Sequence, residues 1–342
     1  MTKRVCVAGT GFFSRFHYEA WSRLDVEITG ICSLDRETAQ KVAADFTHAD
    51  VFADFEQMLD VEKPDLVDIV TPPPTHLNFV SACVERRIPS ICQKPFCGGL
   101  EGARKAVALA GEKNVPVIVH ENFRFQPWFE KIREMIEDGA IGDVYQGTFR
   151  LRPGDGQGPD AYLDRQPYFQ EMPRLLVHET LVHLIDVFRY LFGEVTDVSA
   201  DLRKLNPVIK GEDAGIIILT FENGKRAVID GNRLSDHAAK NRRLTMGEML
   251  MEGAAGVLRL DGDAHLYRRP FGSNDEIAVD YDWVDNGYAG DCVYRLTRHV
   301  VECLERGETP TNTARDYLAN LRIVEAVYRS ASERRRVAPH EI

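Results

Sequence analysis

Hydrophobic residues in the first third of the chain form short apolar runs that alternate with stretches in which apolar residues recur every three to four positions. The first pattern is typical of buried strands and the second of amphipathic helices. The predicted strands cover residues 4–8, 27–32, 66–70, 88–92 and 115–120, and the predicted helices cover 38–46, 55–59, 76–86 and 100–113. Strands separated by helices form a parallel sheet, so residues 1–121 are expected to form a doubly wound nucleotide-binding domain.

The pattern changes after about residue 143, where extended segments follow one another with turn signals between them. The predicted strands cover 144–151, 195–202, 214–221, 226–231, 244–251, 257–260 and 264–268, and helices are expected at 175–191 and 313–332. Between two of these strands, Asn223-Gly224 predicts a tight hairpin, because both residue types adopt positive φ angles. Residues 122–342 are therefore expected to form an α/β domain on a mostly antiparallel sheet.

A segment rich in glycine and proline, residues 152–174, connects two of the predicted elements. It is long for a connector inside a compact domain. A lid or binding loop and a disordered insert are both consistent with such a segment.

Length and charge restrict the class of protein. A chain of 342 residues exceeds the size at which a single core usually keeps growing, which also favours two domains. The chain has 42 basic and 53 acidic side chains and a net charge of -11. This balance disfavours a nucleic-acid partner, which requires a basic stripe.

The cysteines indicate a reducing compartment. There are seven, an odd number without regular spacing, and most lie in apolar runs such as residues 5–7 and 91–92. This usage predicts buried free thiols instead of disulfides. No apolar run is long enough to cross a bilayer and none at the start resembles a signal peptide, so we expect a cytoplasmic protein without a membrane partner.

The first predicted strand leads into Gly9-Thr10-Gly11, followed by a helical pattern. In this context the first glycine allows a tight turn, and the second allows a pyrophosphate to approach the helix N-terminus. Ser14 occupies the third glycine position, so the dinucleotide fingerprint is incomplete. An ordinary turn after a strand remains an alternative.

The end of the second predicted strand should contact the adenosine ribose. It carries Ser33, followed by Asp35 and Arg36. An acidic residue favours NAD by binding the 2′-hydroxyl, whereas serine with a nearby arginine accommodates the 2′-phosphate of NADP. The sequence leaves this choice open.

Two further segments follow predicted strands on the same edge of the sheet. Thr71-Pro72-Pro73-Pro74-Thr75-His76 provides rigid backbone beside a cofactor, or simply a turn before the next helix. Lys94 stands between Gln93 and Pro95 directly after a strand. In a partly desolvated cleft its ammonium can bind a substrate hydroxyl and stabilise an alkoxide-like state, although most lysines are solvated.

The predicted helix over residues 175–191 carries Glu179, His183 and Asp186. Regular helical spacing places these three on one face. His183 is a suitable base for an alcohol proton near neutral pH, with a carboxylate to orient it, but a buried structural histidine is the alternative. Zinc is a weaker interpretation, because His178 is displaced by about 100° from Glu179 in an ideal helix.

Taken together, these segments resemble the Gfo/Idh/MocA family of dehydrogenases. The resemblance includes Gln93-Lys-Pro95 at the family's Glu-Lys-Pro position, residues 122–127, His183-Leu-Ile-Asp186, and residues 320–328 in the closing helix. It implies an N-terminal Rossmann domain and a C-terminal α/β domain on a large open sheet. It also implies a homodimer or homotetramer formed through the exposed face of that sheet.

The resemblance further implies reversible oxidation of a secondary hydroxyl on a sugar, cyclitol or related polyol, with NAD or NADP as cofactor. Lys94 matches the catalytic lysine, His183 the histidine, and Glu179 the position usually held by aspartate. Three departures are Gln93 in place of glutamate, Leu181 in place of a glycine, and Glu179 itself. No motif requires a metal.

In the expected mechanism, His183 takes the hydroxyl proton, Lys94 polarises the same oxygen, and hydride moves to the nicotinamide. Expected substrate contacts, besides His183, are Arg124, Tyr162, Arg165 and Tyr168. Expected cofactor contacts are Gly9, Thr10, Gly11, Phe12, Phe13, Ser33, Arg36, Thr71, Pro72, Pro73, His76, Gln93, Lys94 and Pro95. A dinucleotide-sensing regulator and an NAD-assisted glycosidase remain alternative functions.

Overall fold

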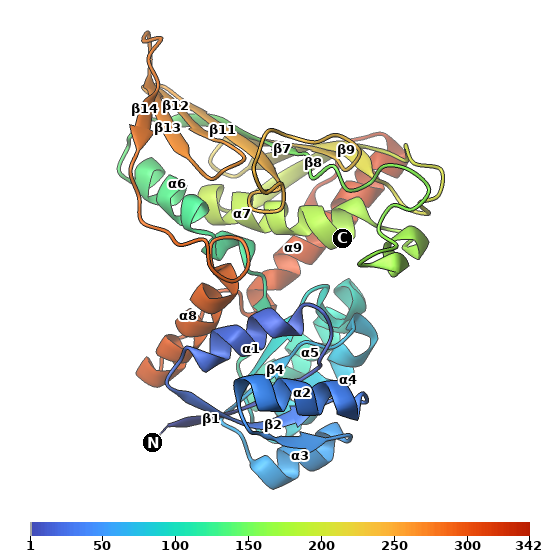
Figure 1. The fold of residues 1–342 in the computed structure, drawn as a ribbon. Helices are drawn as coiled ribbons and strands as arrows, with labels where there is room; N and C mark the ends of the chain where they lie inside the picture. Colours follow the sequence, from blue (N-terminus) through green and yellow to red (C-terminus); the bar gives the residue numbers. More distant parts are fainter. Residues whose placement is uncertain (1) are drawn as a thin grey trace. The chain divides into compact units, whose positions relative to one another are not determined.

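The computed structural model describes residues 2–342 and divides into two compact units (Figure 1). The first unit consists of Met1–Asn122 and Asp291–Ala319, and the second of Phe123–Gly290 and Asn320–Ile342. The expected division into domains after residue 121 stays a prediction. The compact units differ from it by assigning Asp291–Ala319 to the first.

The first unit is built on a six-stranded parallel sheet in the order β3-β2-β1-β4-β5-β6. Its strands are β1 Lys3–Ala8, β2 Val26–Cys32, β3 Asp50–Phe52, β4 Leu66–Ile69, β5 Ser90–Gln93 and β6 Val117–His120. The predicted parallel sheet is confirmed, and β3 was not predicted. The strand order reverses between β1 and β4, and ligands of such sheets bind outside the carboxyl ends of the strands there.

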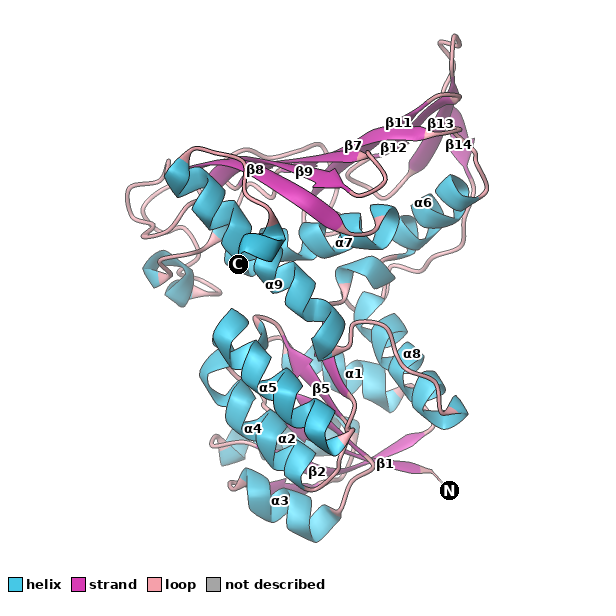
Figure 2. Ribbon diagram, turned by 180° about the vertical axis from the view of Figure 1, so that it is seen from behind, coloured by secondary structure: helices cyan, strands magenta, loops and turns pink. Residues whose placement is uncertain are grey.

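Helices cover both faces of this sheet (Figures 1 and 2). They are α1 Ser14–Ser22, α2 Arg36–Phe46, α3 Phe55–Glu62, α4 Pro73–Glu85, the short η1 Phe96–Gly98, α5 Leu100–Lys113 and α8 Cys292–Arg306. Helix α1 packs against α2 and α8, whereas α4 packs against α3 and α5. Asp35 and Asp54 cap the N-termini of α2 and α3, which explains where those helices begin.

The second unit is built on an eight-stranded sheet in the order β14-β13-β12-β11-β7-β10-β9-β8. Its strands are β7 Val144–Leu151, β8 Val195–Arg203, β9 Ala214–Phe221, β10 Arg226–Asn232, β11 Gly247–Gly253, β12 Gly256–Leu260, β13 Leu266–Pro270 and β14 Ile277–Val279. Strands β7 and β10 pair in parallel, and the other neighbours pair antiparallel. The prediction of a mostly antiparallel sheet is confirmed.

The hairpin predicted at Asn223-Gly224 joins β9 and β10. Only Gly224 of the two residues adopts a positive φ angle, 80°. The Asn223 side chain accepts a hydrogen bond from the backbone N–H of Lys225 over 3.2 Å. The turn therefore needs one left-handed residue, not the two on which the sequence argument relied.

Helices of the second unit lie along one face of its sheet (Figure 2). The helical segments that lie wholly in this unit are η2 Phe123–Phe125, α6 Pro127–Glu137, η3 Pro167–Glu171, η4 Leu176–Leu181, α7 Val182–Phe192 and η5 Pro339–Glu341. The closing helix α9, Ala314–Glu333, begins in the first unit and continues in the second. Of these, α6 was not predicted, nor was α8 of the first unit.

The helix expected over residues 175–191 has a different form. Its first part, η4, is a π-helical turn, and regular α-helix begins only at Val182. The regular spacing assumed for Glu179 relative to His183 is therefore wrong. Wide turns of this kind inside helices occur frequently at functional sites.

The glycine- and proline-rich segment 152–174 is ordered around a small apolar cluster. Ala161, Tyr162 and Phe169 of this segment pack with Leu175 and Ile209. Because these side chains are 5 % exposed or less, the interpretation as a disordered insert is wrong. Whether the segment acts as a lid stays a prediction.

The seven cysteines are all buried, and residues 2–342 contain no disulfide. Within the same residues, no helix has both the length and the apolar character required to cross a bilayer.

Candidate active site

The turn after β1 depends on Gly9, which has a φ angle of 115°. Its backbone N–H donates to the carbonyl of Cys32 at the end of β2 (2.9 Å), and its carbonyl accepts from the Tyr18 hydroxyl (3.0 Å). A Cβ atom at Gly9 would lie 2.6 Å from the carbonyl oxygen of Val70. The tight turn between β1 and α1 thus requires glycine, as the sequence predicted.

Gly11 has different surroundings. A Cβ atom there would meet no atom of residues 2–342 within 4 Å, so its backbone borders open space at the start of α1. The Ser14 hydroxyl, at the third glycine position, donates to the Gly11 carbonyl over 2.7 Å. Phe12 is 60 % exposed, whereas Phe13 packs on Phe16. Helix α1 has no side-chain cap, and uncapped N-terminal amides favour an anion.

The end of β2 approaches the same turn. The hydroxyls of Ser33 and Thr10 share a hydrogen bond of 2.7 Å, which joins the loops after β1 and β2. Both carboxylate oxygens of Asp35 accept hydrogen bonds from Thr38, and these bonds lower the pKa of Asp35. Arg36 is exposed in the first turn of α2. Asp35 therefore serves primarily as a helix cap.

The proline-rich segment follows β4 and starts α4. Pro72 is the N-cap residue and Pro73 the first helical residue, a position where a missing N–H has no cost. Nε2 of His76 donates to the Thr71 carbonyl over 2.7 Å, and burial lowers the pKa of His76. This hydrogen bond from the His76 side chain holds the backbone of the loop at Thr71.

Lys94 directly follows β5 on the carboxyl edge. Its backbone N–H donates to Oε1 of Gln93 over 3.0 Å, and its peptide bond to Pro95 is cis. Pro95 caps η1, and the Lys94 side chain is partly exposed.

A buried polar network lies beside Gln93 and was missed from the sequence. It consists of His17, Trp21, Asp68 and His120, all 1 % exposed or less. Oδ2 of Asp68 lies 2.7 Å from both Nδ1 of His17 and Nε1 of Trp21. The signal that was available is Asp68 itself, a charged residue inside the buried run Leu66–Ile69.

In the second unit, His183 lies in the first turn of α7 and is 5 % exposed. Its ring stacks on Phe123, with centroids 4.1 Å apart and planes inclined by 7°. A flat apolar ring against one face limits rotation of the imidazole, which keeps its nitrogens in a fixed direction.

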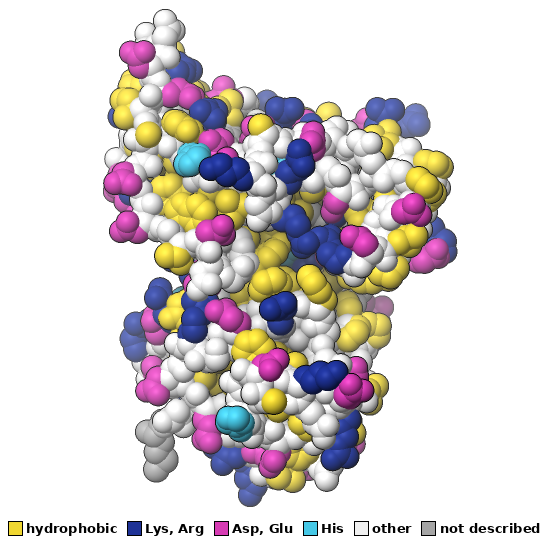
Figure 3. Space-filling view, in the orientation of Figure 1, with side chains coloured by type: hydrophobic (Ala, Val, Ile, Leu, Met, Phe, Trp, Pro, Cys, Tyr) yellow, Lys and Arg dark blue, Asp and Glu magenta, His cyan; other side chains and the backbone are white. Residues whose placement is uncertain are grey.

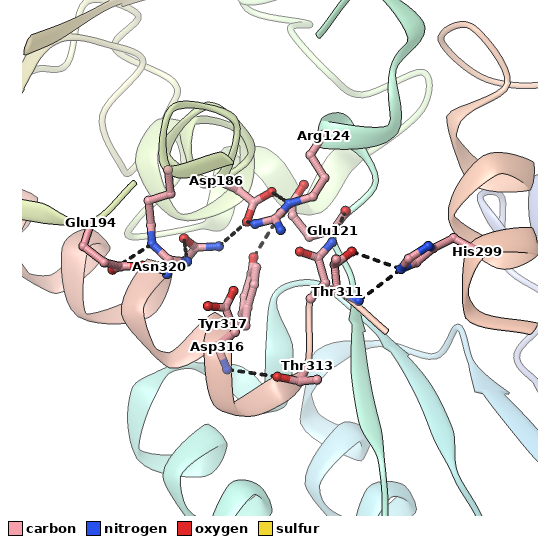
Figure 4. Close-up of polar contacts among 12 residues, drawn as sticks. Glu121, Arg124, Asp186, Glu194, His299, Thr311, Thr313, Asp316, Tyr317 and Asn320 are labelled. Carbon is pink, nitrogen blue, oxygen red and sulfur yellow. Dashed lines mark hydrogen bonds and ion pairs between the residues drawn. The ribbon is translucent and has the colours of Figure 1, made fainter. Parts of the chain in front are cut away.

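Asp186, one turn beyond His183, accepts hydrogen bonds from Arg124 and Asn320 (Figure 4). Arg124 donates from Nε and Nη2 over 2.8 and 2.6 Å, and Asn320 donates over 2.6 Å. Arg189 binds both Asn320 (2.9 Å) and Glu194 (2.5 Å). Arg124 was predicted to contact substrate, and in this structure its guanidinium forms an ion pair with Asp186.

Glu179 lies in the π-helical turn beside a second buried network. Its carboxylate accepts from the Thr180 hydroxyl (2.8 Å) and lies 4.0 Å from Nη1 of Arg233. Arg233 is 2 % exposed, binds Asp155 through Nε and Nη2 (3.1 and 2.7 Å), and binds the Thr180 hydroxyl (2.6 Å). This network holds the 152–174 segment against the turn.

The amides at the start of the π-helical turn have specific partners. The backbone N–H of Leu176 donates to the Glu212 carbonyl and that of Val177 to its carboxylate, both over 3.0 Å. The Tyr328 hydroxyl donates to the same carboxylate over 2.6 Å and accepts from the N–H of His178. Glu212 thus stabilises the irregular backbone.

Two of the predicted substrate contacts lie together. Tyr162 and Arg165 line a cavity of about 340 Å³ with Asp155, Gln157, Asp160, Ala161 and Asp164. Burial raises the pKa of Tyr162 to about 12, so its hydroxyl is protonated at neutral pH. Tyr168 is 57 % exposed, and its hydroxyl accepts from Gln166.

On the face drawn in Figure 3, acidic and basic side chains are intermixed over each unit. Within residues 2–342, no group of three or more histidine, cysteine or acidic residues is arranged to hold a metal ion.

Two segments of the chain match known protein families. Residues 3–121 match an oxidoreductase family with an NAD-binding Rossmann fold. Residues 129–256 match the Gfo/Idh/MocA C-terminal domain.

Relatives cover nearly the whole chain. It is 35% identical to the D-apiose dehydrogenase of Paraburkholderia graminis over 96% of this chain and 88% of that protein. It is 29% identical to the D-apiose dehydrogenase of Rhizobium rhizogenes over 96% and 95% of the two chains. Among solved structures, an Agrobacterium radiobacter oxidoreductase in complex with NAD+, L-tartaric acid and magnesium has a TM-score of 0.89, with 26% identity and coverage of 100% and 99%.

Proposed function

We propose that this chain, which belongs to the Gfo/Idh/MocA family of NAD-binding oxidoreductases, oxidises a secondary hydroxyl group of a sugar, cyclitol or related polyol. One observation carries the proposal most directly. The glycine turn at Gly9 and Gly11 follows β1 and Lys94 follows β5, so both stand on the carboxyl edge of one parallel sheet whose order reverses beside β1.

The residues at this edge fit a dinucleotide. Gly9 provides a turn that a side chain would block, and Gly11 leaves open space at the uncapped start of α1. Gly11 and the first amides of α1 would hold the pyrophosphate, and Ser33 would lie near the adenosine ribose. NAD or NADP bound there would supply the hydride acceptor for oxidation of the carbon that bears the hydroxyl.

Lys94 and His183 are the proposed catalytic residues. His183 removes the hydroxyl proton, and stacking on Phe123 orients its ring. The ammonium of Lys94 donates a hydrogen bond to the same oxygen and stabilises its developing negative charge. Glu179, bound to Thr180 near Arg233, is proposed to adjust the electrostatics around this helix.

The substrate class follows from the relatives and from the second unit. Two of the relatives are D-apiose dehydrogenases, which act on a sugar by name. Tyr162 and Arg165, on the cavity in segment 152–174, supply a hydroxyl and a cation for substrate hydroxyl groups. Arg124 and Tyr168 remain proposed contacts.

The experiment that tests the proposal has two stages. The protein is stripped of carried-over nucleotide and titrated calorimetrically with NAD and NADP in both redox states. Micromolar binding of one cofactor supports the dinucleotide site and identifies the preferred form, and absence of binding overturns the redox assignment. Turnover is then screened with sugars and cyclitols, and Lys94→Ala should abolish it while cofactor binding is retained. Release of sugar without net cofactor reduction would instead identify a glycosidase, and binding without turnover a sensor.

We also propose a homodimer or homotetramer formed through the sheet of the second unit. Helices cover one face of this sheet, and Tyr145, Ile216 and Ile218 are exposed on its strands. An apolar face of this kind favours association with a second copy. Because all seven cysteines are buried and unpaired with one another, a cytoplasmic location is proposed for the protein.

A further inference from the structure

Both the oxygen and the nitrogen of the Gln93 side-chain amide have hydrogen-bond partners. Its Oε1 accepts from the backbone N–H of Lys94 over 3.0 Å, and its Nε2 lies 3.0 Å from Nε2 of His17 and 3.2 Å from Nδ1 of His120. A backbone N–H can only donate, so the amide oxygen must face Lys94. The two amide hydrogens therefore point at the two imidazole rings.

This orientation determines where the histidines carry their protons. A ring nitrogen that faces an amide hydrogen must present a lone pair. The proton of His17 then lies on Nδ1, 2.7 Å from Oδ2 of Asp68, and the proton of His120 lies on Nε2. Both rings are neutral, and the hydrogen bonds run in one direction from Lys94 through Gln93 and His17 to Asp68.

We propose that Gln93 is a positioning residue that keeps His17 and His120 uncharged and thereby fixes the backbone of Lys94. A proton on Nε2 of His17 would oppose an amide N–H across 3.0 Å. Rotation of the amide would relieve this conflict, but it would turn the NH₂ group toward the Lys94 N–H and break that hydrogen bond. The catalytic importance of Lys94 rests on the proposed function; the hydrogen-bond argument does not.

The groups around His17 explain why the Gln93 amide is needed to keep its ring uncharged. Ionisable groups near His17 and its partner carboxylate Asp68 include His120, Tyr18 and Cys92. Burial raises the pKa of Tyr18 and of Cys92 well above their usual values, so both are neutral. Asp68 is then the group that favours an imidazolium, and the Gln93 amide opposes it.

Glutamate at position 93 would reverse the hydrogen-bond polarity. A carboxylate accepts only, so it would require an N–H from both His17 and His120. His17 already directs Nδ1–H toward Asp68, and it would become an imidazolium between two carboxylates. The choice between an amide and a carboxylate at this position therefore decides the charge of the network.

Nitrogen-15 NMR of the imidazole rings tests the proposal, because it distinguishes protonated from unprotonated ring nitrogens. Spectra are recorded on cofactor-free protein from pH 6 to pH 8, and the signals are assigned by their loss in His17→Gln and His120→Gln. We expect a protonated Nδ1 with an unprotonated Nε2 for His17 and the reverse for His120. A His17 ring protonated on both nitrogens at pH 7 would overturn the proposal.

Two substitutions extend the test. In Gln93→Glu both nitrogens of His17 should be protonated at pH 7, because the carboxylate accepts a hydrogen bond from Nε2. In Gln93→Met, which removes the amide but keeps the volume, no donor faces Nε2 of His17, so its signal should change. Gln40→Glu, an exposed change on α2, is the matched control and should leave both rings unchanged. If Gln93→Glu leaves the His17 signal unchanged, Gln93 has only a packing role. The spectra need no substrate, so they remain decisive even if no dehydrogenase activity is found.

Discussion

Arg124 and Asp186 form a bidentate ion pair in which Nε and Nη2 of the arginine meet the two carboxylate oxygens at 2.8 and 2.6 Å. The Asp186 side chain is fully buried, and that of Arg124 is 10% exposed. A planar guanidinium matched to a carboxylate fixes both groups in direction as well as distance. The pair therefore anchors α7, which carries His183, to the segment that follows β6.

Asp186→Ala should destabilise the protein by on the order of 3 kcal/mol, because removing one partner of a buried ion pair leaves the other without its main counter-charge. Urea unfolding followed by circular dichroism measures this. Glu37→Ala breaks the exposed ion pair with Lys41 and is the control, for which little change is expected. Equal effects of the two substitutions would contradict a structural role for the buried pair.

Gly9→Ala and Gly11→Ala should have different effects. At Gly9 the φ angle of 115° and the approach to Val70 at 2.6 Å both disfavour a side chain, so alanine should lower the unfolding temperature and weaken cofactor binding. At Gly11 the open space should leave the unfolding temperature unchanged, while the new methyl group obstructs the pyrophosphate. Thermal unfolding and calorimetric titration separate the two quantities. Loss of stability in Gly11→Ala would argue against an open cofactor site.

His183→Gln should lower kcat by about 10²- to 10⁴-fold, the usual contribution of a general base, with the cofactor Kd unchanged. The comparison requires steady-state kinetics on a substrate found in the screen. His340→Gln, near the C-terminus, is a matched control and should leave kcat unchanged. A fall in kcat by less than a factor of ten would remove His183 from the mechanism.

Stability should fall as the pH rises above 9. Burial raises the pKa of Cys6 and Cys97 to about 12 and that of Cys32 to about 11, from an unfolded value of 9.0. Above pH 9 the unfolded chain loses these protons while the folded protein keeps them, so the unfolding free energy decreases with pH until about 11 to 12. Urea titrations at pH 8 and 10.5 measure the decrease. It should be smaller in Cys32→Ala, and an identical decrease would exclude a contribution from this thiol.

Ile218→Arg should reduce the size of the proposed assembly, because it places a charge on the exposed apolar face of β9. Sedimentation velocity of the wild type and the variant at equal concentration gives the oligomeric state. Glu56→Arg, on the exposed side of α3 in the first unit, should leave it unchanged. A wild-type protein that sediments as a monomer would refute the proposed association.

The sequence was sufficient for the parts of the fold that depend on local pattern. The apolar runs of β1, β2, β4, β5 and β6 and the glycine turn were predictable because buried parallel strands and positive φ angles leave clear residue signals. Strand β3 was not predictable from the sequence, because Asp50 is exposed and Val51 and Phe52 are only partly buried. Helix α8 was not predicted, although its apolar residues lie on one face.

The parts that escaped prediction depend on contacts between distant residues. The π-helical turn is stabilised by Glu212 and Tyr328, which lie far along the chain from Glu179. The hydrogen bonds of Gln93 to His17 and His120 join segments separated by 76 and 27 residues. No local pattern reports such pairs, so the residue types were visible but their orientation was not.

The first unit is discontinuous, and this has a consequence for synthesis. Its chain leaves after Asn122 and returns at Asp291, where α8 packs on α1 and Arg23 binds Asp291 over 2.5 and 2.8 Å. Tyr317 then donates to Glu121 at the end of the first segment. Although domains generally fold in the order in which they leave the ribosome, the unit that begins first here can be completed only after the whole second sheet has been made. Until then, the side of α1 that α8 will cover lacks this packing partner on the nascent chain.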